Sequence, residues 1–187
     1  MRYILAAIGI VVLIIFVVII VMRGSSGPSS KSASANTVTL TDYINKDSQV
    51  TLTTYGPVVG NDQRQAVRIT VSPNNRFFSI LRTYESLPEN AQVYGNNQTA
   101  YSFFMHSLSG LGFSNERTVK NQDELGACPF GQVTVYQLFS QGKQVLNTWS
   151  SNCTTKDGTF AGSASGVTRL FQAQITNYSE LTANLNY

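Results

Sequence analysis

The sequence predicts an α+β domain behind an N-terminal membrane helix, and three features of the sequence support this. An uncharged apolar run lies near the N-terminus, the rest of the chain mixes β-type and helical patterns, and the only two cysteines flank a predicted hairpin. The expected domain is an antiparallel sheet of about six strands with two helices packed on it. Its two hairpins fall near residues 65–84 and 132–151.

The apolar run extends from Ile4 to Met22 without a charged residue, Pro, Asn or Gln. Its 19 residues would form a helix of about 28 Å, close to the hydrocarbon thickness of a bilayer. A cleavable signal peptide has a shorter apolar region, with a small-residue cleavage site soon after it. We therefore expect an uncleaved signal-anchor helix over residues 4–22, preceded by a short cytoplasmic tail of residues 1–3.

Residues 23–36 read RGSSGPSSKSASAN, a serine-rich segment with two glycines and one proline. This composition predicts a flexible linker with a root-mean-square span of about 20 Å. Residues 37–187 then form the extracytoplasmic domain, which is long enough to bury a core of its own. Once Arg2 and Arg23 are set aside from the 13 Lys and Arg, the remaining 11 nearly balance the 10 Asp and Glu. No basic cluster is visible, so we expect no nucleic-acid partner.

Cys128 and Cys153 are predicted to form a disulfide, because the sequence between them has the pattern of a hairpin. The runs QVTVYQLF and KQVLNTWSS are joined by SQG, which suits a three-residue loop with Gly142 in the left-handed region. Pairing Phe139 with Lys143 sets Val133 opposite Trp149 and brings the cysteines within reach.

Other uses of the two cysteines find less support in the sequence. Zinc would need two further ligands where the chain has one histidine, His106, and a redox C-x-x-C motif is absent. A disulfide persists in oxidising compartments, so it predicts that the amino terminus is cytoplasmic and the domain lies outside the membrane.

Four further runs alternate apolar and polar residues and are predicted strands, at residues 37–43, 49–56, 65–72 and 76–84. The last is apolar on both faces, which is typical of a strand inside a sheet. Helical spacing of apolar residues predicts helices within residues 96–113 and 165–175.

The sequence shows no phosphate-binding loop, dinucleotide fingerprint or suggestive carboxylate pair, so we expect no catalytic residues, cofactor or metal. His106, a cysteine and Arg169 follow the chain order used by anchored sortase transpeptidases. The residues before Cys153, WSSN, depart from the T-L-x-T-C strand end of that family. An extracytoplasmic hydrolase or transpeptidase is therefore the second alternative function.

The overall layout resembles that of type IV pilins, which have an N-terminal hydrophobic helix, an α+β head and a C-terminal disulfide loop. This resemblance implies a surface-filament subunit. The chain lacks the glycine before a phenylalanine-led helix and the glutamate five residues into it, and Gly24, Gly27 and Pro28 would break the long helix. A pilin-like subunit is the first alternative function.

The run ENAQVYGNNQTAY, residues 89–101, is a candidate binding loop in which Tyr94, Asn96, Asn97 and Tyr101 combine aromatic rings and amides. Such side chains bind sugars or peptides, and the same composition is typical of an ordinary turn and helix cap. The favoured function is a binding or envelope-assembly module, anchored in the cell membrane by its N-terminal helix, with a protein or glycan partner at the cell surface.

Overall fold

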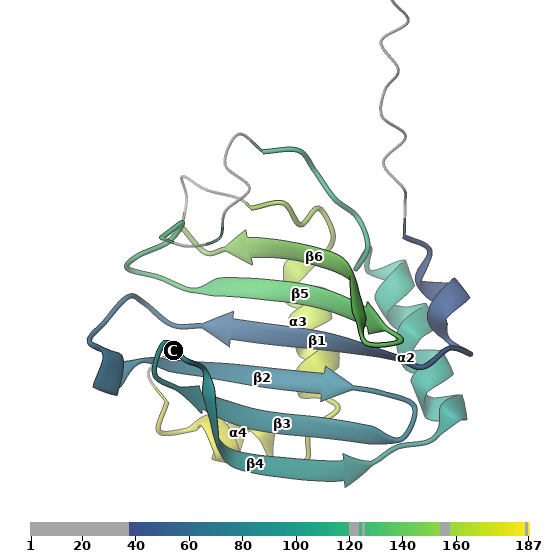
Figure 1. The fold of residues 1–187 in the computed structure, drawn as a ribbon, viewed down its shortest axis with the longest axis horizontal. Coiled ribbons are helices and arrows are strands. Elements are labelled where there is room, and N and C mark those ends of the chain that lie inside the picture. The colour runs from purple at the N-terminus through teal and green to yellow at the C-terminus, as the bar shows by residue number, and fades with distance from the viewer. Residues whose placement is uncertain (1–37, 120–123, 125, 154–157, 186) are drawn as a thin grey trace, which may run out of the picture. The chain divides into compact units, whose positions relative to one another are not determined.

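The computed structural model of the chain describes residues 38–119, 124, 126–153, 158–185 and 187 (Figure 1). In these residues six strands form one antiparallel sheet in the order β4-β3-β2-β1-β5-β6, which confirms the predicted sheet. The strands are β1 (Ser48–Tyr55), β2 (Gln65–Val71), β3 (Asn75–Arg82), β4 (Leu87–Gly95), β5 (Val133–Ser140) and β6 (Lys143–Ser151).

The helices lie on one face of the sheet. They are α2 (Gln98–Gly110), α3 (Ala164–Gln172) and the short α4 (Tyr178–Thr182), with the 3₁₀ turn η1 (Leu40–Tyr43) beside α2; a second 3₁₀ turn, η2 (Asn61–Gln63), lies in the β1–β2 connection. In Figure 1, α3 and α4 lie behind the sheet, and α2 lies beside η1 at the end where β1 begins. The α+β architecture is therefore confirmed in the part of the chain that the structure describes.

The predicted membrane helix, residues 4–22, and the predicted linker, residues 23–36, lie outside the described residues. Among the helices that are described, none has both the length and the apolar character needed to cross a bilayer.

The main core lies between the helices and one face of the sheet. Side chains at alternate strand positions point into it, such as Leu52, Ile69 and Tyr136. Tyr136 is fully buried and stacks on Phe160 at a centroid distance of 4.0 Å. Phe171 of α3 joins the same aromatic cluster through Phe113, which contacts Tyr136, and it also contacts Phe104 of α2.

The opposite face of the sheet has no helix over it, and its side chains are mostly polar. Thr51 and Thr70 hydroxyls lie 3.1 Å apart across β1 and β2, and Arg68 Nε donates to Thr53 Oγ1 at 3.1 Å. At one end of this face Val135 and Trp149 form a second small cluster with Ala127, and Phe77 and Val93 pair on the same face at its β4 side.

The predicted first strand, residues 37–43, is wrong where the structure describes it: Leu40–Tyr43 forms the 3₁₀ turn η1. Leu40 and Ile44 are both buried, and their spacing of four residues is helical. The Thr–Val alternation suggested a strand, whereas burial of these two side chains against α2 determines the local structure.

The predicted register of the β5–β6 hairpin is also wrong. The loop has two residues, Gln141 and Gly142, with φ values of 51° and 73°, and Ser140 pairs with Lys143. Two positive φ values match the twist of antiparallel strands better than the expected three-residue loop does. An irregularity after Leu138 shifts the pairing further, so Val133 faces Ser151 rather than Trp149.

Strand β4 was not predicted, and it replaces most of the expected loop over residues 89–101. It forms an exposed edge that carries Pro88 and a register shift near Asn90, whose φ is 50°. Proline and bulges at an edge discourage pairing with other chains. At the other edge, Trp149 of β6 accepts a hydrogen bond from Phe160 N at 2.9 Å.

One buried hydroxyl links η1, β1 and α2. Ser48 Oγ donates to Tyr43 O at 2.7 Å, so the phenol of Tyr101, 2.9 Å away, must donate to Ser48 Oγ. Burial raises the pKa of Tyr101 above its ordinary value of 10.0, which keeps the phenol a neutral donor.

This hydrogen-bonded link predicts that two variants lose unequal amounts of stability. Ser48→Ala should lower the free energy of unfolding by about 2 kcal/mol, because it leaves the buried Tyr101 hydroxyl and the Tyr43 carbonyl without this partner. Tyr101→Phe should lower it by about 1 kcal/mol, because one hydrogen bond is lost and no donor is left buried. Urea unfolding measures both, and equal losses would contradict the assigned donor direction.

Candidate functional site

Three connecting segments meet at the end of the sheet where β1 finishes, and they enclose a pocket of about 200 Å³. They are the β1–β2 connection with η2, the β3–β4 turn, and the segment before β5 that contains Cys128. The residues that line the pocket are Tyr55, Gly56, Val58, Arg64, Thr83, Tyr84, Ser86, Glu124, Gly126, Cys128 and Val133.

Arg64 is the cation of this lining. Its guanidinium carbon lies 5.0 Å from the ring centroid of Tyr55 and 5.1 Å from that of Tyr84. Its Nη1 donates to Gly56 O at 2.5 Å and to Pro57 O at 3.1 Å. The two aromatic contacts, worth roughly 0.5–1 kcal/mol each at an exposed site, hold the guanidinium plane in place.

Tyr84 fastens the β3–β4 turn to the β1–β2 connection at two points. Its backbone N–H donates to Asn61 Oδ1 at 2.9 Å, and its hydroxyl donates to Val59 O at 2.9 Å. Thr83 and Ser86 flank this contact with φ values of 63° and 56°. A left-handed threonine costs about 1–3 kcal/mol, and such strain is often found where a loop binds a ligand.

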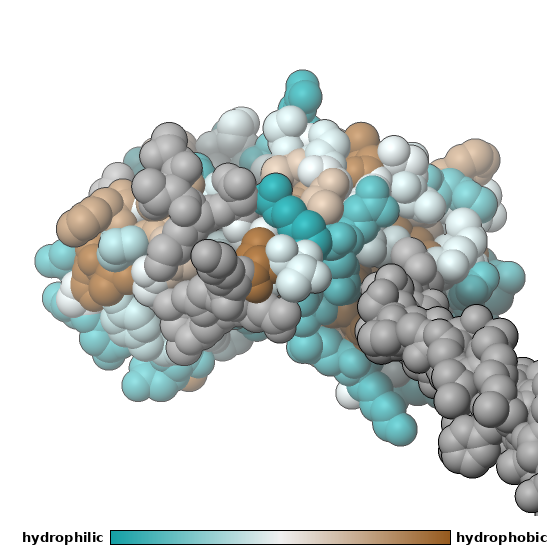
Figure 2. Space-filling view, turned by 90° about the horizontal axis from the view of Figure 1, so that it is seen from above, coloured by the Kyte–Doolittle hydropathy of each residue, from teal (hydrophilic) through white to brown (hydrophobic). Residues whose placement is uncertain are grey.

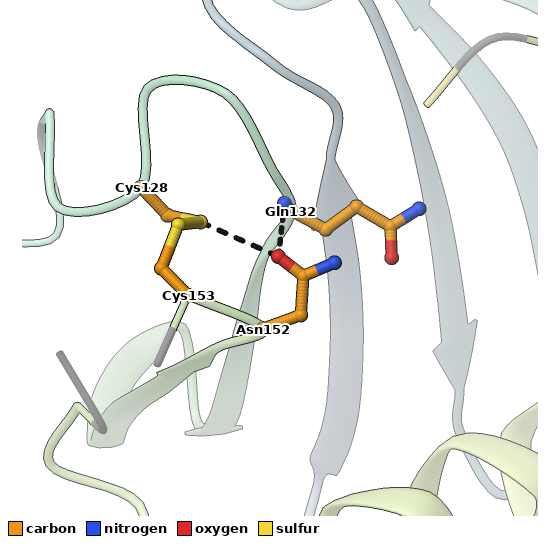
Figure 3. Close-up of a disulfide and its surroundings, with 4 residues drawn as sticks. All are labelled: Cys128, Gln132, Asn152 and Cys153. Atoms are coloured by element: carbon orange, nitrogen blue, oxygen red, sulfur yellow. Dashed lines mark hydrogen bonds between the residues drawn. A yellow bond between two sulfur atoms is a disulfide. The ribbon is translucent and has the colours of Figure 1, made fainter. Parts of the chain in front are cut away.

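The third wall is held by the disulfide between Cys128 and Cys153, whose Cα atoms lie 5.6 Å apart (Figure 3). Asn152 Oδ1 accepts a hydrogen bond from Gln132 N at 2.8 Å and lies 3.3 Å from Cys128 Sγ. Because a disulfide sulfur carries no hydrogen, the second approach is a close contact rather than a donated bond. The predicted disulfide is confirmed.

Gly131 permits this packing. A Cβ at that position would lie 2.3 Å from Asn152 Oδ1 and 2.7 Å from Cys128 Sγ. The neighbouring Pro129 O accepts a hydrogen bond from Val58 N at 2.8 Å, which joins this wall to the β1–β2 connection. The β1–β2 connection is therefore tied to both of the other segments.

The floor of the pocket is the second apolar cluster on the open face of the sheet. Tyr55 and Val133 belong both to the pocket lining and to the cluster of Ala127, Val135 and Trp149. The segment that carries Cys128 covers these side chains, which would otherwise be open to solvent on a face that has no helix.

Exposed apolar side chains gather around the pocket. Of the six large hydrophobic residues that are well exposed in the described chain, four belong to the pocket-forming segments or directly follow one: Val58 (55 %), Tyr84 (50 %), Leu87 (57 %) and Phe130 (95 %). Figure 2 shows tan and brown side chains at its left end, which is the end where β1 finishes in Figure 1. We call these four residues the apolar rim.

The residues predicted as a binding loop do not share one surface. Tyr94 lies in β4, where its hydroxyl donates to Thr176 O at 3.2 Å, and Asn96 Nδ2 donates to Ser72 O at 2.7 Å. Asn97 caps α2 by accepting from Ala100 N at 2.9 Å, and Tyr101 is fully buried. Tyr94 and Asn96 lie at the end of β4, Asn96 beside the β2–β3 turn, and Asn97 and Tyr101 begin α2, so these residues do not form the single loop that was expected.

His106 is exposed on α2 and Arg169 is exposed on α3, while both cysteines are joined to each other. The described residues contain no group of three His, Cys, Asp or Glu side chains placed to hold a metal. No protein-family model matches the chain, and no curated protein matches it in sequence. The function must therefore be argued from the pocket itself.

The sequence contains no motif that would have identified this pocket. Tyr55, Arg64 and Tyr84 come from separate connections, and only the pairing of β1, β2 and β3 brings them together. The one available signal was Phe130, an aromatic residue between a cysteine and a glycine in a predicted loop.

The disulfide predicts a large stability effect. Removing it by Cys128→Ala with Cys153→Ala should lower the free energy of unfolding by roughly 3 kcal/mol, from the chain entropy of a loop closed across 25 residues. Non-reducing peptide mapping should recover one cross-linked pair, and urea unfolding gives the stability. Gly131→Ala, which keeps both cysteines, should also destabilise; wild-type stability in that variant would contradict the packing around Asn152.

Proposed function

We propose that this chain is a membrane-anchored extracytoplasmic binding module whose ligand site is the pocket with its apolar rim. The observation that carries the proposal is that the segments around this hollow, or residues directly following them, supply four exposed large apolar side chains, while the β1–β2 connection is hydrogen-bonded to both other walls. An apolar patch of this kind on a soluble domain marks an interaction site. The rigid scaffold of the sheet presents it from loops, as binding sites commonly are.

The place where the chain enters the domain supports this proposal. Residue 38 leads into η1, which packs against α2 at the start of β1, whereas the pocket lies at the end of β1. A tether over residues 23–36 would therefore join the folded domain near the start of β1, away from the pocket-forming segments. The disulfide supports a location in an oxidising compartment.

The anchor and the topology can be tested together in native membranes. The full-length chain should stay in the membrane pellet after an alkaline carbonate wash, because residues 4–22 would span the bilayer. Neither cysteine should react with an alkylating reagent until the protein is reduced. Two labelled thiols in freshly isolated, folded protein would place the domain in a reducing compartment and overturn the topology.

The binding site can be tested by photo-crosslinking on intact cells. A photoreactive phenylalanine analogue in place of Phe130 should give discrete adducts, because this side chain is 95 % exposed on the segment that forms the third wall of the pocket. The matched control places the same analogue at Phe103, which is 71 % exposed on α2 at the other end of β1. Identical adduct patterns at the two positions would contradict a partner at the pocket.

A further inference from the structure

We infer that the pocket binds the free carboxyl end of a peptide that finishes on an apolar residue. This inference rests on the proposed binding function and adds the chemistry of the ligand. Three properties of the described residues point to it: the size of the pocket, its apolar floor and rim, and the guanidinium of Arg64.

The size of the pocket selects a small group. Its volume of about 200 Å³ is below the roughly 300–1,000 Å³ of sites that enclose drug-sized ligands. It has room for about one residue and too little for a nucleotide or an oligosaccharide. Because Tyr55, Val58 and Val133 supply the floor and one wall, the group that fills it is an apolar side chain.

Arg64 adds a donor pair suited to a carboxylate. Its Nη1 is occupied by the carbonyls of Gly56 and Pro57, whereas its Nε and Nη2 donate to no group in the described residues. These two nitrogens form one edge of the guanidinium plane, which is the geometry that binds a carboxylate through two parallel hydrogen bonds. The rings of Tyr55 and Tyr84 already hold that plane, so little orientation is lost on binding.

The small volume of the pocket, together with the guanidinium of Arg64, favours the carboxyl end of a peptide over an internal acidic residue. An α-carboxylate and its own side chain share one Cα, so both fit a pocket of one residue. An aspartate or glutamate beside an apolar residue would place the carboxylate on a second residue, for which the pocket has no room. Glu124 also lines the pocket, and its negative charge would repel a ligand carboxylate, so that carboxylate belongs at the Arg64 side.

The test uses three fluorescein-labelled peptides and the full-length protein in detergent micelles, with empty micelles as the blank. The first peptide is Gly-Ser-Gly-Leu with a free carboxyl end, the second is its carboxyl amide, and the third is Gly-Ser-Gly-Ser with a free carboxyl end. Fluorescence anisotropy should show that the first peptide binds at least about tenfold more tightly than either of the others. A tenfold difference in affinity corresponds to the loss of one charge-assisted hydrogen bond or of one buried side chain.

Two arginine variants distinguish a specific contact between Arg64 and the ligand carboxylate from nonspecific attraction by positive charge. Arg64→Gln should remove the difference between acid and amide, whereas Arg68→Gln, a half-buried arginine on the open face outside the pocket, should preserve it. Should Arg64→Gln unfold, Arg64→Lys replaces it, since the lysine keeps the charge and lacks the paired donors; the ratio should again fall.

Each other outcome overturns the inference in a distinct way. Equal binding of acid and amide that is lost in Phe130→Ala would refute the carboxylate contact and leave the binding function in place. Absence of binding by all three peptides would refute the peptide ligand, and the cross-linking from position 130 would then decide the binding function separately.

Discussion

The constraint on which the rest of this structure depends is that its helices cover only one face of the sheet. The uncovered face is polar over β1 and β2, where threonine hydroxyls meet one another and Arg68. At one end, however, the strands carry Val135 and Trp149, and these side chains need a cover. The cover is a segment without strand or helix, held in place by the bond between Cys128 and Cys153.

The geometry of the pocket therefore depends on contacts between loops as much as on the sheet. Val58 N reaches Pro129 O, Tyr84 reaches Val59 O, and Arg64 reaches two carbonyls of the β1–β2 connection. None of these bonds belongs to the ladder of the sheet. Each joins residues far apart in sequence or turns a segment back on itself, so the site is assembled only after the strands have paired.

The parts of the fold that follow local patterns could be predicted from the sequence. Alternation identified β1, β2 and β3, and apolar spacing identified α2 and α3. The positions of the two cysteines predicted their disulfide correctly. The expected register of the hairpin between them was wrong, because the hairpin has a two-residue turn and a bulge. The segment at Leu40 and the edge strand β4 were missed because burial against α2 and pairing with β3 decide them.

The pocket could not be predicted for a related reason. Tyr55, Arg64 and Tyr84 have no common spacing, and their meeting depends on the order of strands in the sheet. Tyr101 was misplaced for a different reason. The polar composition of the run around it suggests a surface role, whereas its ring is buried and its hydroxyl bonds to Ser48. A tyrosine inside an asparagine-rich run has no local feature that separates these two positions.

Strand β1 extends from near the start of the folded domain to the pocket, and this arrangement has a mechanical consequence. A partner pulling at the pocket while the chain is held at residue 38 would load β1 along its length. Antiparallel ladder bonds lie perpendicular to the strand, and β1 is bonded to β2 on one side and β5 on the other. The pull would strain both ladders in shear, with many bonds sharing the force, rather than peel them apart one at a time. The strand order would thus let the domain resist tension applied between residue 38 and the pocket.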